Sequence, residues 1–135
     1  MATQPQDLTG LSHLGNTQNK PQQTLETFPN RNAGRNYTVE LSTDEFTCLC
    51  PLTSQPDFAQ FEISYVPDEK CVELKSLKSY FWSFRNEGAF HEKVTNTIAD
   101  DIIAAIAPRK FKIVATWNVR GGIGTIVTVE HEKRR

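Results

Sequence analysis

The apolar positions of this chain follow two rhythms, one typical of strands and one typical of helices. Apolar and polar residues alternate over 59–65, 111–117 and 123–129. Strict alternation predicts a strand with one buried face and one solvated face. The last two runs flank the Gly121-Gly122 pair, and alternating runs on both sides of a diglycine predict a β-hairpin.

Extended backbone is also predicted earlier in the chain. Residues 37–41 alternate and lead to a second extended segment at 46–50, which Pro51 stops because proline has no N–H for a strand ladder. Pro56 and the polar residues before it predict a turn, and the strand over 59–65 comes next.

This turn returns a carboxyl group toward a thiol. Cys50 is expected at the end of one strand, and Asp57 in the first residues of the next. A thiol beside a titratable acid has the composition of a nucleophile with its proton donor. The alternative is a cysteine that only packs and an aspartate that caps the turn, because free cysteines are commonly buried and inert.

Between the strands the apolar spacing changes to that of helices. A first helix is predicted over 74–86 and ends where Gly88 breaks the pattern. Its apolar stripe consists of Leu74, Leu77, Phe81 and Phe84. Its other face carries Lys75, Lys78, Trp82 and Arg85. A second helix is predicted to end before Pro108, with a stripe every four residues at Phe90, Val94, Ile98, Ile102 and Ile106.

The predicted order is strand, strand, helix, helix, strand, strand. This order predicts an α+β fold with an antiparallel sheet and two helices on one face. The domain is expected to cover 35–131, between a mobile arm at 1–34 that docks locally near 25–28 and a charged tail at 132–135. Exposed sheet edges are usually covered by copies of the same chain, so we expect a ring-like homo-oligomer with ligand sites where subunits meet.

Composition narrows the class of protein. The chain has 135 residues, which suits one domain, and its 15 basic and 16 acidic residues give a net charge of −1, which predicts no nucleic-acid surface. No apolar run approaches the ~18 residues of a membrane span, and we expect no signal peptide. Three cysteines without a secretory context predict reduced thiols and a cytoplasmic protein, and their spacing is poor for a structural zinc site.

Three further groups carry candidate chemistry, each with a plain alternative. His91 and Glu92 open the second helix, where an acid also suits a helix N-terminus. Lys75 and Lys78 lie one helical turn apart and could hold phosphates, or could form a solvated face. The Arg120–Gly122 segment could bring a guanidinium and bare backbone to a phosphate, or could simply be a hairpin turn.

In combination, these motifs resemble a known family. The matching segments are Leu49–Pro51, Gln55–Phe58, Val72–Lys78, Ser83–Asn86, Phe90–Glu92 and Arg120–Gly122. The sequence resembles the short, single-module form of 7-cyano-7-deazaguanine reductase, the NADPH-dependent nitrile reductase of queuosine biosynthesis. The family pattern that begins at Glu73 is matched at seven of eight positions, and Ser79 is the departure. The resemblance extends from about Leu11 to Glu130.

The resemblance implies a tunnelling fold assembled into rings, and a reaction that turns the nitrile into an aminomethyl group. The family's nucleophile corresponds to Cys50, which forms a covalent thioimide, and its proton donor corresponds to Asp57. The implied substrate contacts are Val72, Glu73, Leu74, His91 and Glu92. The implied NADPH contacts are Leu74, Lys75, Lys78, Arg120 and Gly121, without a Rossmann fingerprint and without a metal.

The residues alone do not exclude two other classes of function. One is a zinc-dependent pterin-forming cyclohydrolase of the same fold, with Cys50, another cysteine and His91 as ligands. The other is a non-catalytic purine-binding module, against which the pairing of Cys50 with Asp57 argues.

Overall fold

The computed structural model describes residues 4, 6 and 22–134, so most of the expected arm lies outside the described residues. The described elements are β1 (Thr27–Pro29), β2 (Val39–Leu49), β3 (Pro56–Val66), β4 (Lys70–Val72), α1 (Leu74–Trp82), α2 (His91–Ile106), β5 (Lys110–Arg120) and β6 (Ile123–Glu132). The fold is α+β with antiparallel sheets, as predicted. None of the described helices is long and apolar enough to cross a membrane.

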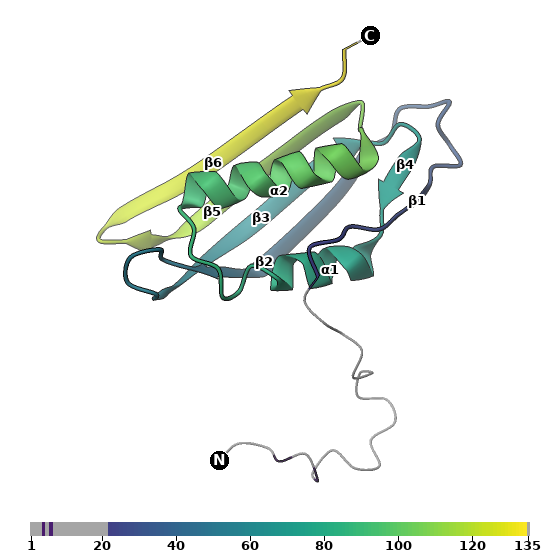
Figure 1. Cartoon of the computed structure of the whole chain (residues 1–135). Coiled ribbons are helices and arrows are strands. Elements are labelled where there is room, and N and C mark those ends of the chain that lie inside the picture. Colours follow the sequence, from purple (N-terminus) through teal and green to yellow (C-terminus); the bar gives the residue numbers. More distant parts are fainter. Residues whose placement is uncertain (1–3, 5, 7–21, 135) are drawn as a thin grey trace.

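The main sheet has four strands in the order β2-β3-β5-β6, and every neighbouring pair is antiparallel. Figure 1 shows both helices in front of this sheet, with α2 over its middle and α1 beside β2. A second, two-stranded sheet pairs β1 with β4. It was not part of the predicted order, because three residues are too few for alternation to be visible. β1 lies at the expected docking point of the arm.

The core lies between the main sheet and the helices. β3 and β5 bury alternate side chains, namely Ala59, Phe61, Ile63, Tyr65, Phe111, Ile113, Ala115 and Trp117. These side chains form one continuous cluster with buried residues of α1 and α2, so both helices cover the same face. The opposite face keeps Gln60, Glu62 and Lys112 exposed, as the alternation predicts.

The first predicted helix departs from the structure at Leu74 of its stripe and at its C-terminal end, whereas Leu77, Phe81 and Phe84 pack in or against the core. Leu74 is 59% exposed, because it is the first helical residue and lies outside the packed turn. Tyr80 is fully buried in its place, and its hydroxyl donates to Asp101 at 2.5 Å, which satisfies the one polar atom of its ring. The helix ends at Trp82 and not at residue 86, because the next N–H groups, such as that of Phe84, bond three residues back.

The stripe of α2 is confirmed from Val94 onward, where every fourth residue is buried. Phe90 was expected in this stripe but is 64% exposed. It is the N-cap, with φ −68° and ψ 151°, so its extended backbone takes the ring out of the helical row.

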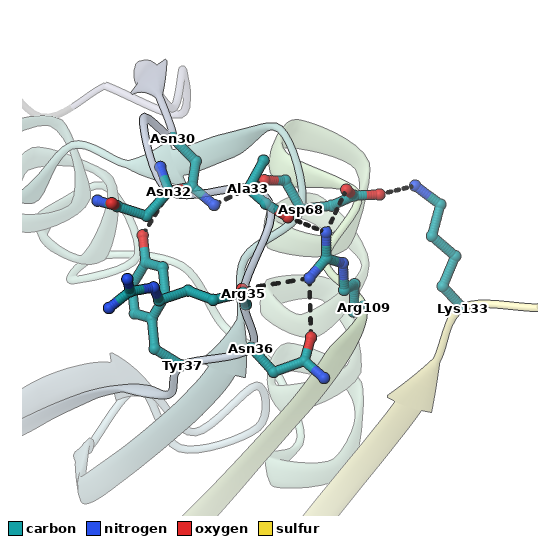
Figure 2. A network of polar contacts seen from close by, with 9 residues as sticks. All are labelled: Asn30, Asn32, Ala33, Arg35, Asn36, Tyr37, Asp68, Arg109 and Lys133. Carbon is teal, nitrogen blue, oxygen red and sulfur yellow. Dashed lines mark hydrogen bonds and ion pairs between the residues drawn. The ribbon is translucent and has the colours of Figure 1, made fainter.

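A polar network fastens the end of the sheet that lies away from the Cys50 turn. Figure 2 shows Arg109 at its centre, donating to Asn36 at 2.8 Å and to the carbonyl of Ala33 and pairing with Asp68. Lys133, from the expected charged tail, also pairs with Asp68 at 2.7 Å. The Lys133 ammonium, aided by Arg109, lowers the pKa of Asp68. The network therefore joins the loop before β2, the β3–β4 turn, the α2–β5 connection and the C-terminal segment.

Candidate active site

Cys50 follows the last residue of β2, one position beyond the predicted strand end. Its N–H donates to the carbonyl of Gln55 at 2.8 Å, and its own carbonyl accepts from Ser54 at 3.0 Å. Ser54 has a left-handed φ of 59°, which closes the loop tightly. The loop therefore holds the nucleophile candidate in a fixed, half-buried position.

The loop also favours the thiolate of Cys50. The Thr53 hydroxyl, followed by the backbone N–H groups of Thr53 and Leu52, lowers the pKa of Cys50. Burial of the thiol and then the charge of Asp57 oppose this effect. Cys48 behaves in the opposite way, since burial raises its pKa to about 11. A thiolate is the reactive form of cysteine, so the two thiols are chemically distinct.

Asp57 is a buried carboxylate with partners on both oxygens. Its Oδ1 pairs with the guanidinium of Arg120, and its Oδ2 lies 3.4 Å from His91 Nε2. Arg120 also donates to the carbonyl of Pro56 at 2.9 Å. In register, Asp57 lies opposite Cys48, two residues before the nucleophile candidate. The fold thus brings Asp57, His91 and Arg120 together beside the Cys50 loop.

His91 lies flat on an aromatic ring that sequence reasoning did not single out. The imidazole and the Trp117 indole stack with centroids 4.1 Å apart and planes 2° apart. Trp117 is buried between this imidazole and Phe46 and Phe61. The place of Trp117 in the alternating run of β5 predicted only that it is a core residue. Its contact with His91 depends on tertiary packing, which the sequence pattern does not predict.

Glu73 has a structural role that was also not predicted. It is the N-cap of α1, and its carboxylate accepts from the N–H groups of Lys75 at 2.8 Å and Ser76 at 2.7 Å. These bonds, with that to the Ser76 N–H first, lower the pKa of Glu73. The segment that was predicted to bind substrate therefore also fixes the start of the lysine-bearing helix.

The predicted lysine face borders a groove. Lys78 lines a cavity of about 440 Å³ between α1 and β2, with Trp82 and Arg85 from the same helical region. Phe46, Phe61 and Phe81 contribute apolar surface to it. Lys75 is exposed on the same helix.

The predicted site residues do not all meet within one chain. The N–H of Val72 donates to the Tyr65 hydroxyl at 3.2 Å, so Val72 and Glu73 lie beside the far end of β3. Tyr65 and Asp57 are eight residues apart in that strand, which corresponds to roughly 26 Å. A purine-sized ligand held by Cys50 and Asp57 therefore cannot reach Val72 and Glu73 of the same chain.

Within residues 4, 6 and 22–134, no three His, Cys, Asp or Glu side chains gather as a possible metal-ligand set.

Comparison with known proteins identifies the family of this chain. A family model described as QueF-like protein matches residues 56–135. A protein of Syntrophus aciditrophicus named NADPH-dependent 7-cyano-7-deazaguanine reductase is 54% identical over 132 residues, covering 98% of this chain and 94% of that protein. The chain belongs to the QueF-like family. A relative of the same name in Magnetococcus marinus is 60% identical over 111 residues, covering 82% of this chain and 87% of that protein.

A solved structure of the QueF-like family has a similar fold. The crystal structure of the archaeosine synthase QueF-Like in the apo form matches with a TM-score of 0.65 over 73% of this chain and 96% of that chain. At 20% sequence identity, this likeness concerns the fold alone. The family resemblance predicted from the motifs is confirmed, and membership selects the reductase family over the cyclohydrolase and the simple binding module.

Proposed function

We propose that this chain is an NADPH-dependent nitrile reductase that converts 7-cyano-7-deazaguanine to its 7-aminomethyl product, a step of queuosine biosynthesis in the cytoplasm. The observation that carries the proposal is the Cys50 loop, where hydrogen bonds lower the pKa of an accessible thiol beside the Asp57–His91 pair. Relatives at 54% and 60% identity, both named for this reaction, support it.

In the covalent step, the sulfur of Cys50 bonds to the nitrile carbon and one C≡N π bond breaks. The nitrile nitrogen takes a proton from Asp57, which yields a thioimide. His91, at 3.4 Å from Asp57, returns a proton to the carboxyl group. A thioimide accepts a hydride more readily than a nitrile, so the covalent bond divides one hard step into easier ones.

The two reduction steps balance with two hydrides. When bound, NADPH would supply one hydride to the thioimide carbon and, in a second binding event, one hydride to the imine carbon. Between the two reductions the C–S bond breaks. The amino nitrogen gives one proton to the departing Cys50 sulfur, which restores the thiol and leaves an imine. The nitrogen takes a proton at each reduction, through Asp57, so the product is a primary amine.

Recognition of the base falls to the start of α2. Glu92 is exposed in the first turn of α2, next to His91, and its carboxylate suits the N–H donors of a guanine-like edge. His91 stacks on Trp117 and is therefore held in a fixed plane at the site. Val72, Glu73 and Leu74 complete the proposed substrate contacts.

The residues present fit the cofactor. Lys78 and Arg85 place positive charge on a groove with aromatic surface, which suits phosphates attached to flat rings. Lys75 and Leu74 lie at the start of the same helix. Arg120 and Gly121 complete the proposed set, and Gly121 has an open left-handed backbone at φ 56°. In the present conformation Arg120 pairs with Asp57, so a phosphate that binds Arg120 competes with that carboxylate.

The active assembly is a tunnelling-fold ring in which two subunits share each site. One subunit supplies Cys50, Asp57 and His91, and its neighbour supplies Val72 and Glu73. The separation of roughly 26 Å along β3 within one chain supports this arrangement. The edge strands β2 and β6 of the main sheet offer the surfaces through which copies can pair.

The test is nitrile-dependent oxidation of NADPH, followed by absorbance, with two NADPH consumed per amine formed. Intact-protein mass spectrometry without NADPH should show the nitrile's mass added to wild type and not to Cys50→Ala. Absence of both turnover and adduct in wild type overturns the proposal. An adduct that persists in Cys50→Ala refutes the assignment of the nucleophile.

A further inference from the structure

A short backbone bridge connects the end of β2 to the segment that enters α2. The N–H of Leu49 donates to the carbonyl of Glu87 at 2.9 Å, and the N–H of Ala89 donates to the carbonyl of Leu49 at 3.0 Å. Leu49 and Gly88 thus form an isolated parallel bridge outside the named strands. Cys50 follows the bridge on one side, and His91 follows it on the other.

Gly88 makes this approach possible because it lacks a side chain. A Cβ built at Gly88 would lie 3.1 Å from the Cα of Pro51 and 3.6 Å from its Cβ. The nearer atom belongs to the backbone, so it cannot rotate away as the end of a flexible side chain would. The φ of Gly88 is not left-handed, unlike that of Gly121 and Gly122, so the position requires glycine for space and not for conformation.

A shift of the Pro51 backbone also moves Cys50, the proposed nucleophile. Cys50 is its direct neighbour and is fixed by its N–H bond to Gln55 at 2.8 Å and by the bond from Ser54 to its carbonyl at 3.0 Å. A side chain at Gly88 must therefore displace the Cys50 loop, or displace the start of α2 by a similar amount.

We infer that residues 87–89 form a positioning bridge, and that Gly88 is the residue in it that sets the distance between the Cys50 sulfur and the base-binding start of α2. The inference rests on the proposed function, because the proposed nitrile substrate is the one ligand that contacts both the Cys50 thiol and the start of α2. A ligand held by Glu92 must present its nitrile carbon to Cys50, and the bridge fixes how far apart those two groups lie. Misplacement by about 1 Å can cost roughly 100-fold in rate. The 3.1 Å contact at Gly88 requires a shift of a few tenths of an ångström, so the expected loss is smaller.

The experiment compares Gly88→Ala with Gly34→Ala, the same chemical change at a position where no described residue lies within 4 Å of the added carbon. The rate of adduct formation with the nitrile should fall about 5- to 10-fold in Gly88→Ala and stay near wild type in Gly34→Ala. Alkylation of Cys50 by iodoacetamide needs no base-binding group, so its rate should change less than about threefold.

Each result of this comparison either supports or overturns the positioning role of Gly88. A selective loss of the nitrile adduct supports the inference, whereas equal adduct rates in Gly88→Ala and Gly34→Ala overturn it. A parallel loss of adduct, alkylation and thermal stability also overturns it, because Gly88 then only supports the fold. If Gly88→Ala does not fold, Ala89→Pro removes one bridge bond without added bulk at 88, and the same selective loss is required. Wild type that forms no adduct would instead refute the proposed function.

Discussion

The proposed sharing of each site between two subunits makes a quantitative prediction for mixed assemblies. Cys50→Ala removes the nucleophile, and Glu73→Gln should weaken substrate binding roughly 10- to 100-fold if its carboxylate or its segment contacts the ligand. Cys50 and Glu73 lie beside opposite ends of β3, whose Asp57 and Tyr65 are roughly 26 Å apart along the strand. In a ring they can meet only across an interface between subunits.

Random mixing of the two variants then restores a fixed share of sites. A site is intact when its first subunit retains Cys50 and its neighbour retains Glu73, so about one quarter of the sites should regain activity. The assay co-expresses the variants with two different tags, purifies the doubly tagged assemblies and measures nitrile-dependent oxidation of NADPH.

The matched control pairs Cys50→Ala with Glu92→Gln. Glu92 lies next to His91, which contacts Asp57 in the same chain, so both losses fall in one half of the site and no recovery is expected. The reasoning fails if the Cys50→Ala and Glu73→Gln mixture is no more active than its parents. It also fails if Glu73→Gln alone is fully active.

Three further predictions test the chemistry, the cofactor groove and the core. Thr53→Val removes the first cause of the lowered pKa of Cys50, so the pH at which the alkylation rate of Cys50 rises should increase. Cys48 should stay unreactive near neutral pH because its pKa is about 11. An unchanged pH profile of Cys50 alkylation contradicts the role given to the loop. Lys78→Ala should raise the KM for NADPH about tenfold and leave adduct formation intact, and the wild-type KM should rise with salt more than that of the variant. Ile98→Ala, at a fully buried position of α2, should lower the free energy of unfolding by about 2–5 kcal/mol in chemical denaturation, and a loss below 1 kcal/mol would contradict the packing described.

The elements with strong periodicity were predictable from the sequence. The four-residue steps from Val94 to Ile106 and the alternating runs around Gly121 depend only on local spacing, and they match α2 and the β5–β6 hairpin. Where local backbone geometry decides, the pattern was wrong: Leu74 and Phe90 belong to their stripes by spacing, but a helix start and an N-cap turn them outward.

The sequence predicted which residues belong to the candidate site better than it predicted the contacts between them. Motif resemblance named Cys50, Asp57, His91 and Arg120, but the pairing of Arg120 with Asp57 joins residues 63 positions apart and follows only from the β3–β5 register. The contact between Trp117 and His91 has the same origin, since it depends on how α2 lies across β5. Local signals do not encode such pairs.

The two tryptophans of the chain lie in the two parts of the proposed site. Trp117 is buried against the imidazole of His91, whereas Trp82 is 39% exposed at the groove that Lys78 borders. Their fluorescence therefore provides two built-in optical reporters. With Trp82→Phe, the remaining emission follows ligand arrival at His91. With Trp117→Phe, it follows occupation of the groove. The order in which nitrile and NADPH bind can thus be measured without an added dye.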